Sequence, residues 1–366
     1  MIRTLSPYNY KIPFKSVDFE LICQKYTLEL FIWNGAKADV PATATESWTK
    51  SNPLGLGENG EFDTINISRV LADYVETALS SPEFDTQMLN GDSQWWLKSQ
   101  VLYYTTPATP ESKEPPAYIT TQLFNRGYSY GLEGENVTDV PDNIMATGRE
   151  FRVNRGGIFL LPIYTPDNTV PTVKVDSYPD REVRVDVTAN LDFDVSGESV
   201  QNLWVKIGAA PTDTDIIVSV DGVEVSLIIE DEYKHSPVDI IFRNKFGALQ
   251  SVTFFKEMKS DLRVTNKTYE NDAGQPIDGV HQFRTLNVQG RESFSIQSGW
   301  VEESMNETYK QLLLSEEVWK YDILAEAKYT PLNLKSKNIS YKTQAVDRLI
   351  QYDLDFEYSY NAINNI

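Results

Sequence analysis

The chain has 366 residues, of which 41% are hydrophobic and 12% aromatic, so it is long enough for two or three domains with apolar cores. Its 33 basic and 53 acidic residues give a formal net charge of −20, and such a surface repels nucleic acid and anionic lipid. No segment approaches about 18 uninterrupted apolar residues, so we expect no membrane-spanning helix. The N-terminal sequence also lacks the apolar core of a secretory signal.

The cysteine and histidine content restricts the chemistry that the chain can carry. One cysteine, Cys23, excludes an intramolecular disulfide and a cysteine-based zinc site. Cys23 lies in the alternating segment DFELICQKYTLEL, which predicts a buried thiol. The two histidines, His235 and His281, leave few general bases or metal ligands.

Short strand-like segments dominate the first 145 residues. Thr27–Trp33, Gln94–Tyr104 and Tyr118–Asn125 are rich in aromatic and β-branched residues and are separated by turn-forming residues. Apolar residues at helical spacing predict one helix within 66–79, capped by Asn66 or Ser68 and closing one end of a sandwich. A proline-rich exposed loop is expected over 105–116. These patterns predict an N-terminal β-sandwich over residues 1–145 with one short helix.

The middle of the chain, residues 146–235, is predicted to be a second β-rich domain. The segment GGIFLLPIY begins a new series of strands, and 181–195 alternates over a long run. IIVSVDGVEVSLII predicts a hairpin with a type I′ turn at Asp221-Gly222. The run from Asp192 starts like a calcium loop, but Leu203 stands where an EF-hand needs its last carboxylate, so we expect no calcium site.

Residues 236–366 are predicted to form an α+β domain that ends in a hairpin. In PVDIIFRNKFGALQSVTFF, two apolar runs flank a turn in which Gly247 supplies a permissive conformation. Arg243, Asn244 and Lys245 have no carboxylate or histidine partner in register there, so we interpret this stretch as architectural.

A helix and a terminal strand follow in the same region. Ser304 and Glu307 match an S-x-x-E capping box, which predicts a helix over 304–321 packed on the terminal sheet. The chain then ends in the alternating segment LIQYDLDFEYSY, typical of a half-buried strand. Residues 337–344 are its expected hairpin partner.

Asp353, Asp355 and Glu357 share one face of that last strand. A metal site or a glycosidase pair needs carboxylates that converge from different elements, so we expect these three to face solvent or a basic partner. The candidates for cross-strand pairing with them are Lys335, Lys337 and Lys342.

No other motif indicates catalysis. The sequence around Ser298 lacks the G-x-S-x-G pattern of a nucleophile elbow, and His281 is expected to be a surface or interface residue. We predict a non-enzymatic protein with no catalytic residue, no cofactor and no metal site.

Exposed aromatic residues raise one alternative, a receptor- or glycan-binding adhesin with a host surface glycan as its partner. The residues suited to sugar stacking are Trp33, Trp48, Trp95, Trp96 and Tyr104. Against this, Trp95 and Trp96 are adjacent and point to opposite faces of a strand, so at most one of them is expected in the core of the sheet.

Several segments resemble virion structural proteins of tailed bacteriophages that infect Bacteroidetes, including the crAss-like phages. They are PVDIIFRNKFGALQSVTFF, QLLLSEEVWKY and LNLKSKNISYKTQAVDRLIQYDLDFEYSYNAINNI, with YTLELFIWNG and INISRVLADYVE nearer the N-terminus. The resemblance implies a structural subunit of the collar or tail, made in the host cytoplasm and built into the virion. Its expected partners are portal, ring, tail or spike subunits and further copies of itself, with neither nucleic acid nor membrane.

The end of the chain fits an assembly role. Ile363 and Ile366 follow the alternating strand directly. Apolar side chains in such a position are expected to dock on a sheet or on a neighbouring subunit.

Overall fold

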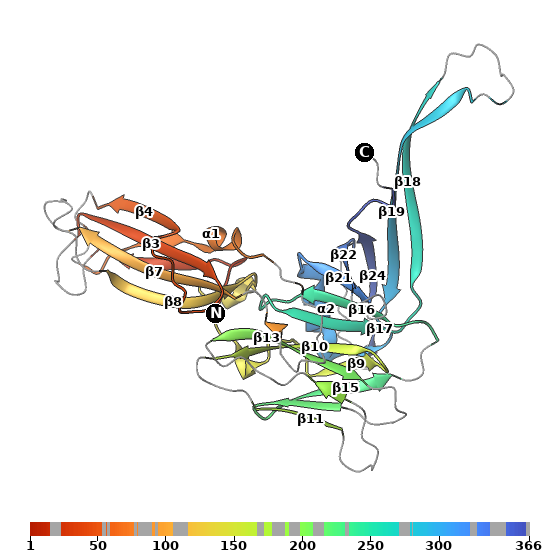
Figure 1. The fold of residues 1–366 in the computed structure, drawn as a ribbon, viewed down its shortest axis with the longest axis horizontal. Coiled ribbons are helices and arrows are strands. Elements are labelled where there is room, and N and C mark those ends of the chain that lie inside the picture. The colour runs from red at the N-terminus through yellow and green to blue at the C-terminus, as the bar shows by residue number, and fades with distance from the viewer. Residues whose placement is uncertain are drawn as a thin grey trace.

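The computed structural model describes residues 1–14, 23–52, 56, 59–76, 79, 90–91, 94–104, 116–166, 172–177, 187–189, 198–207, 216–230, 234–270, 279, 281–322, 328–336 and 349–363. Strands arranged in several sheets dominate these residues, with two short α-helices among them (Figure 1). The mainly-β, sandwich-like class expected from the sequence is confirmed. No helix in this described part is long and apolar enough to cross a membrane.

The N-terminal part is built on a five-stranded sheet. Its order is β1 (Ile2–Arg3), β8 (Ala117–Asn125), β7 (Trp95–Tyr104), β3 (Lys25–Asn34) and β4 (Glu46–Ser51). A two-stranded sheet, β2 (Asn9–Pro13) with β5 (Phe62–Asn66), and the helix α1 (Ser68–Ala72) contribute to the same core. That core includes Tyr26, Leu28 and Tyr103 from the large sheet and Leu71 from α1. The thiol of Cys23 is also buried in this core, as predicted.

Helix α1 is shorter than the sequence predicts. It ends at Ala72, although apolar spacing continues and Val75 still packs in the same core. Asn66 Oδ1 accepts a hydrogen bond from the Ser68 N–H at 3.0 Å, while the Ser68 hydroxyl donates to the Ser6 carbonyl at 2.6 Å. Tertiary packing, rather than helix length, therefore secures this segment.

Two four-stranded sheets share the core of the middle part. The first contains β10 (Ile158–Thr165), β13 (Ser199–Ile207), β12 (Val187–Ala189) and β6 (Asn90–Gly91). The second contains β11 (Val173–Ser177), β14 (Ile216–Val220), β15 (Val223–Glu230) and β9 (Glu150–Asn154). The predicted β14–β15 hairpin is confirmed, since Asp221 and Gly222 both have positive φ, at 50° and 85°. The Asp192 run lies outside the described residues.

A seven-stranded sheet with only antiparallel neighbours forms the C-terminal part. Its order is β17 (Leu249–Phe254), β16 (Val238–Arg243), β21 (Val318–Asp322), β22 (Lys328–Leu334), β24 (Asp353–Tyr358), β19 (Phe283–Gln297) and β18 (Lys259–Glu270). Two further strands, β20 (Val301–Glu302) and β23 (Leu349–Ile350), pair beside it. Short 3-10 turns are η2 (Gly131–Glu133), η3 (Pro141–Asn143) and η4 (Glu303–Met305).

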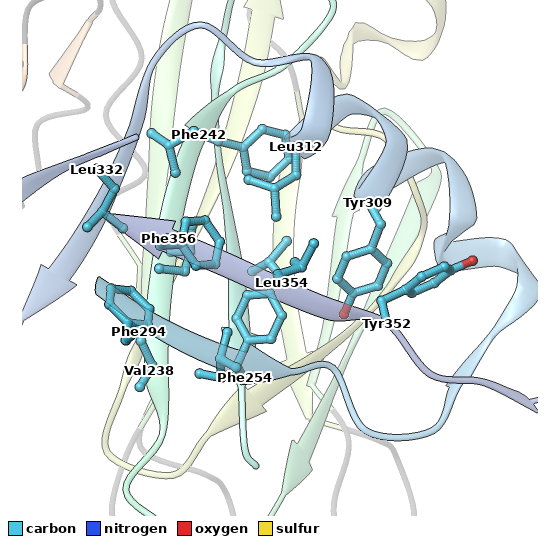
Figure 2. Close-up of a cluster of buried hydrophobic side chains, with 14 of the residues drawn as sticks. Val238, Phe242, Phe254, Phe294, Tyr309, Leu312, Leu332, Tyr352, Leu354 and Phe356 are labelled. Atoms are coloured by element: carbon cyan, nitrogen blue, oxygen red, sulfur yellow. The ribbon is translucent and has the colours of Figure 1, made fainter. Parts of the chain in front are cut away.

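Helix α2 (Asn306–Leu314) covers one face of this sheet, as expected. Figure 2 shows Tyr309 and Leu312 of the helix above Phe254, Leu354 and Phe356 of the strands. The opposite face is covered at the β16–β21 end by the middle part, where Trp204 of β13 packs in a shared cluster. The sheet residues of that cluster are Ile241, Leu249, Trp319 and Tyr321.

The predicted length and cap of this helix are wrong. Residues 303–305 form η4, Ser304 makes no capping hydrogen bond, and the helix ends at Leu314 rather than near 321. Ser315 is extended, and its hydroxyl donates to the Glu317 carbonyl at 2.8 Å. The β-branched and aromatic residues Val318, Trp319 and Tyr321 then fill a central strand, where such residues pack well.

The terminal strand, β24, is an inner strand of the seven-stranded sheet. The two neighbours of β24 are β22 and β19. The expected hairpin partner, 337–344, lies outside the described residues. Near the end of the chain, the Ala362 N–H donates to the Gly290 carbonyl of β19 at 2.8 Å, whereas the Ile363 side chain is exposed.

Candidate interaction surface

The turn of the β16–β17 hairpin, residues 244–248, lies against the segment that follows β8. The Tyr128 N–H donates to the Lys245 carbonyl at 2.8 Å. A Cβ atom added to Gly127 would lie 2.7 Å from the same carbonyl oxygen, and one added to Gly247 would lie 2.7 Å from Gly127 N. The two backbones therefore approach at a distance that glycine alone permits.

The polar side chains of this turn have partners, including carboxylates, that the local sequence did not predict. Arg243 Nε lies 2.7 Å from a Glu317 carboxylate oxygen, and Lys245 Nζ lies 3.3 Å from Glu133. Asn244 donates to the Met145 carbonyl and accepts from two backbone N–H groups of its own turn. The carboxylates come from elements distant in sequence, so the prediction of unpartnered side chains is wrong.

Helix α2 is tied to the same junction through Tyr130. Its hydroxyl donates to Glu307 Oε1 at 2.5 Å, and Lys310 Nζ lies 3.6 Å from the centre of its ring. Burial alone raises the pKa of the Glu307 carboxyl, but hydrogen bonds from Tyr130 and Gln311 and the nearby lysine charges outweigh it and lower the pKa. The turn, the post-β8 segment and α2 form one hydrogen-bonded junction.

The tryptophans considered for sugar stacking mostly serve packing. Trp33 and Trp96 are buried and stack on each other with ring centres 6.4 Å apart. They belong to a cluster with Met145 and Phe246, while Trp95 packs against the core on the other face of the sheet. Of these two adjacent tryptophans only Trp96 is a buried core residue, as expected, and Trp95 is half-buried. Trp48 and Tyr104 are half-buried.

Strand β18 and the first part of β19 leave the body as a two-stranded arm (Figure 1). Every residue of β18 is exposed. Phe283 is 63% exposed and Leu262 is 58% exposed. Three more large apolar side chains of the arm are also exposed: Val264, Tyr269 and Leu286.

The arm has a free edge and an irregularity in its register. Strand β18 is the terminal strand of the sheet, so one side of its backbone has no strand partner among the described residues. Pairing shifts between Thr265 and Lys267, where Asn287 of β19 adopts a φ of 49°. Such a bulge increases the local twist of the strand pair.

One face of the C-terminal sheet remains open at the β24–β19–β18 end. Asp353 and Asp355 of β24 are exposed there. Glu357 is buried, with Lys335 at 2.5 Å and Arg291 at 3.1 Å. Hydrogen bonding from Lys335, and then from Arg291, lowers the pKa of the Glu357 carboxyl despite some burial.

The three carboxylates of the predicted acidic row, Asp353, Asp355 and Glu357, therefore have different surroundings. The pairing of Lys335 with this row is confirmed, and Lys337 and Lys342 lie outside the described residues. Asp353 and Asp355 face solvent as expected, whereas Glu357 forms a partly enclosed ion-pair cluster.

Other residues singled out in the sequence have ordinary surroundings. The Ser298 hydroxyl donates to the Gly299 carbonyl and accepts from the Tyr352 N–H, and His281 is exposed. Within the described ranges, no group of three histidine, cysteine or carboxylate residues is arranged to hold a metal ion.

Comparisons with known proteins do not assign the chain to a family. No protein-family model and no curated protein matches the chain. Among solved structures, the chain is similar to the S-layer protein rSbsC(31-844), with 12% sequence identity and a TM-score of 0.21. The alignment covers 86% of this chain and 41% of that one, so the chain spans less than half of the S-layer protein. A similarity this weak carries no functional argument.

Proposed function

We propose that this chain is a non-enzymatic structural subunit of a tailed-bacteriophage virion, located at the collar or tail and acting through protein–protein interfaces. The observation that carries the proposal is the arm formed by β18 and β19. Its large apolar side chains have no cover in the described part of the chain.

An uncovered arm of this kind indicates a partner. A two-stranded ribbon alone in water is marginally stable, and exposed apolar patches of this type usually mark interaction sites. Covering Leu262, Val264 and Phe283 against a neighbour contributes free energy at roughly 25 cal/mol per Å² of apolar surface removed from water. The free edge of β18 also offers backbone groups for strand addition.

The remaining features are consistent with this role. The resemblance noted above concerns collar and tail proteins of such phages, and a net charge of −20 limits nonspecific aggregation of subunits before assembly. Rings and spikes are symmetric oligomers, which need large interfaces between copies and to neighbouring virion proteins.

The proposal is tested by replacing the chain in particles of the phage that encodes it. A strain that supplies Leu262→Ser/Phe283→Ser in place of the wild-type chain is expected to yield particles depleted of this subunit by about 10-fold, because two apolar anchors are lost. Mass spectrometry of gradient-purified particles measures the incorporation.

The matched control changes two exposed leucines of the body, Leu132→Ser/Leu314→Ser. It is expected to be incorporated like the wild type. Absence of the wild-type chain from purified particles, or normal incorporation of the arm variant, contradicts the proposal.

A further inference from the structure

We infer that the open face of the C-terminal sheet docks on a second copy of this chain, with the arm of one copy resting on strand β24 of the other. This inference rests on the proposed function and names the partner of the basic face of the arm, which is opposite to the face of Leu262 and Val264. The contact joins a basic row on the arm, Arg263, Lys267 and Arg284, to an acidic row on β24, Asp353 and Asp355.

The pairing register places both rows on one face of the same sheet. Directly paired residues of two antiparallel strands lie on the same face of a sheet, and Arg263 is paired with Arg291 and Tyr269 with Arg284. The odd-numbered residues of β18 therefore share a face with Arg284 and Arg291 of β19. Ser295 of β19 lies opposite both Lys259 of the arm and Asp355 of β24. The acidic row therefore continues directly into the face that carries the basic row.

The charge on this face of the arm is opposite to that of the whole protein. Its charged side chains are Lys259, Asp261, Arg263, Lys267, Arg284 and Arg291. Five basic groups against one acidic group give +4, in a chain with a net charge of −20. Oppositely charged patches attract and orient two molecules before they dock.

Neither row is neutralised within its own chain. Among the described residues, Arg263, Lys267 and Arg284 form no ion pair, and the same holds for Asp353 and Asp355. The Asp355 carboxylate accepts one hydrogen bond, from the Ser295 hydroxyl at 2.6 Å. Both rows are thus available to a neighbour.

Two apolar side chains lie among the basic ones. Tyr269 is on the same face as Lys267, and Leu286 lies directly opposite Lys267 on β19. Both are exposed. Specific protein interfaces typically combine apolar anchor residues with surrounding charged residues. The anchors contribute most of the binding free energy, and the charges fix the relative orientation of the two partners.

A second copy fits these features better than nucleic acid. The acidic row that complements the arm is present on this chain, so two copies related by a two-fold axis can exchange the contact reciprocally. Nucleic acid approaching the arm meets the field of a protein with a net charge of −20.

Two charge-reversed full-length chains test the contact. Arg263→Glu/Lys267→Glu reverses the arm, and Asp353→Lys/Asp355→Lys reverses the acidic row. Sedimentation velocity over a dilution series is expected to show self-association of the wild type, with a Kd weakened about 10-fold or more in each variant alone. An equimolar mixture of the two variants is expected to recover association to within about 3-fold of the wild type, since each arm then meets an opposite charge.

The control Lys174→Glu/Lys234→Glu removes the same charge from exposed positions on the body, and it is expected to associate like the wild type. A monomeric wild type, an unaffected arm variant, or a mixture that fails to recover overturns the inference. DNA binding that the arm reversal abolishes, without self-association, assigns the arm to nucleic acid and overturns it as well.

These outcomes separate the inference from the proposed function. If the wild type is monomeric but the arm variant is lost from particles, the chain remains a virion subunit and its arm binds a different virion protein. If copies associate as inferred but the wild-type chain is absent from particles, the arm contact stands and the proposed function fails.

Discussion

Gly247 occupies the position where the hairpin turn meets the segment after β8, and a side chain there has no room. Its φ is 80°, and an added Cβ would lie 2.7 Å from Gly127 N and 2.8 Å from Arg126 C. We expect Gly247→Ala to lower the free energy of unfolding by about 2–4 kcal/mol, since backbone strain and overpacking act together. Denaturant unfolding followed by tryptophan fluorescence measures the change.

Gly222 provides the matched control for this substitution. Its φ of 85° is equally unfavourable for alanine, but no atom lies within 4 Å of the added Cβ. Gly222→Ala is therefore expected to cost only about 1–2 kcal/mol, the strain alone. Equal losses at the two positions would show that the close backbone approach at the junction is unimportant.

Asp239 on β16 is a partly buried carboxyl whose ionisation opposes folding. Burial raises its pKa to about 6, the hydrogen bond from Thr253 at 2.6 Å opposes the rise, and the charge of Asp322 adds to it. The folded state therefore binds the proton more tightly than the unfolded state. Its contribution to stability is fully present below the unfolded pKa of about 4 and is lost as the pH rises through about 6.

We expect Asp239→Asn to raise the free energy of unfolding at neutral pH by about 1–3 kcal/mol, because the amide keeps the acceptor for Thr253 without the charge. The gain is expected to shrink toward zero as the pH falls to about 4. Melting temperatures of the variant and the wild type between these pH values test this. Asp73→Asn, at an exposed carboxyl, is the control, and a gain that does not depend on pH would refute the assignment.

Among the secondary-structure elements, helix α2 carries one fully buried leucine and one exposed leucine. Leu312 is 0% exposed and packs on the seven-stranded sheet, whereas Leu314 is 52% exposed. Leu312→Ala is expected to lower the free energy of unfolding by about 2–5 kcal/mol, and Leu314→Ala by less than about 0.5 kcal/mol. Chemical denaturation of both variants checks the packing of the helix, and similar losses would contradict it.

The sequence allows prediction of those elements whose pattern is local. The β14–β15 hairpin follows from Asp221-Gly222 between alternating arms, and the β16–β17 hairpin follows from Gly247 between two apolar runs. The end of α2 could not be predicted in this way. Residues 315–321 continue the helical spacing of apolar groups, but a place in the centre of a sheet favours the strand.

The candidate site was harder to predict than the fold. In β18, Leu262 and Val264 alternate with polar residues, which indicates a strand but says nothing about whether anything covers it. The burial of Trp33 and Trp96 depends on Met145 and Phe246, residues far away in the sequence. The exposure of the arm and the burial of these two tryptophans both depend on contacts between distant segments of the chain. Such contacts cannot be predicted from the spacing of apolar residues along the sequence.

At the scale of the whole molecule, the sheets form a body with two different extensions. Figure 1 shows the N-terminal sheet on one side of the middle and C-terminal sheets, and the β18–β19 arm leaving the body elsewhere. The junction at Gly247 holds the N-terminal sheet to the body, together with the Lys245–Glu133 ion pair and the hydrogen bond that Arg243 donates to Asn125 Oδ1 at 3.3 Å. A fixed body with one uncovered arm suits a subunit that repeats around a symmetry axis.

The proposal that this chain is a virion subunit is tested most directly by an electron-microscopy map of the tailed-phage particles to which the proposal assigns it. We predict repeated copies of the chain in a symmetric collar or tail assembly, with the basic face of each β18–β19 arm resting on β24 of an adjacent copy. A map in which the chain is absent, or in which its arms project into solvent without a partner, would contradict the account.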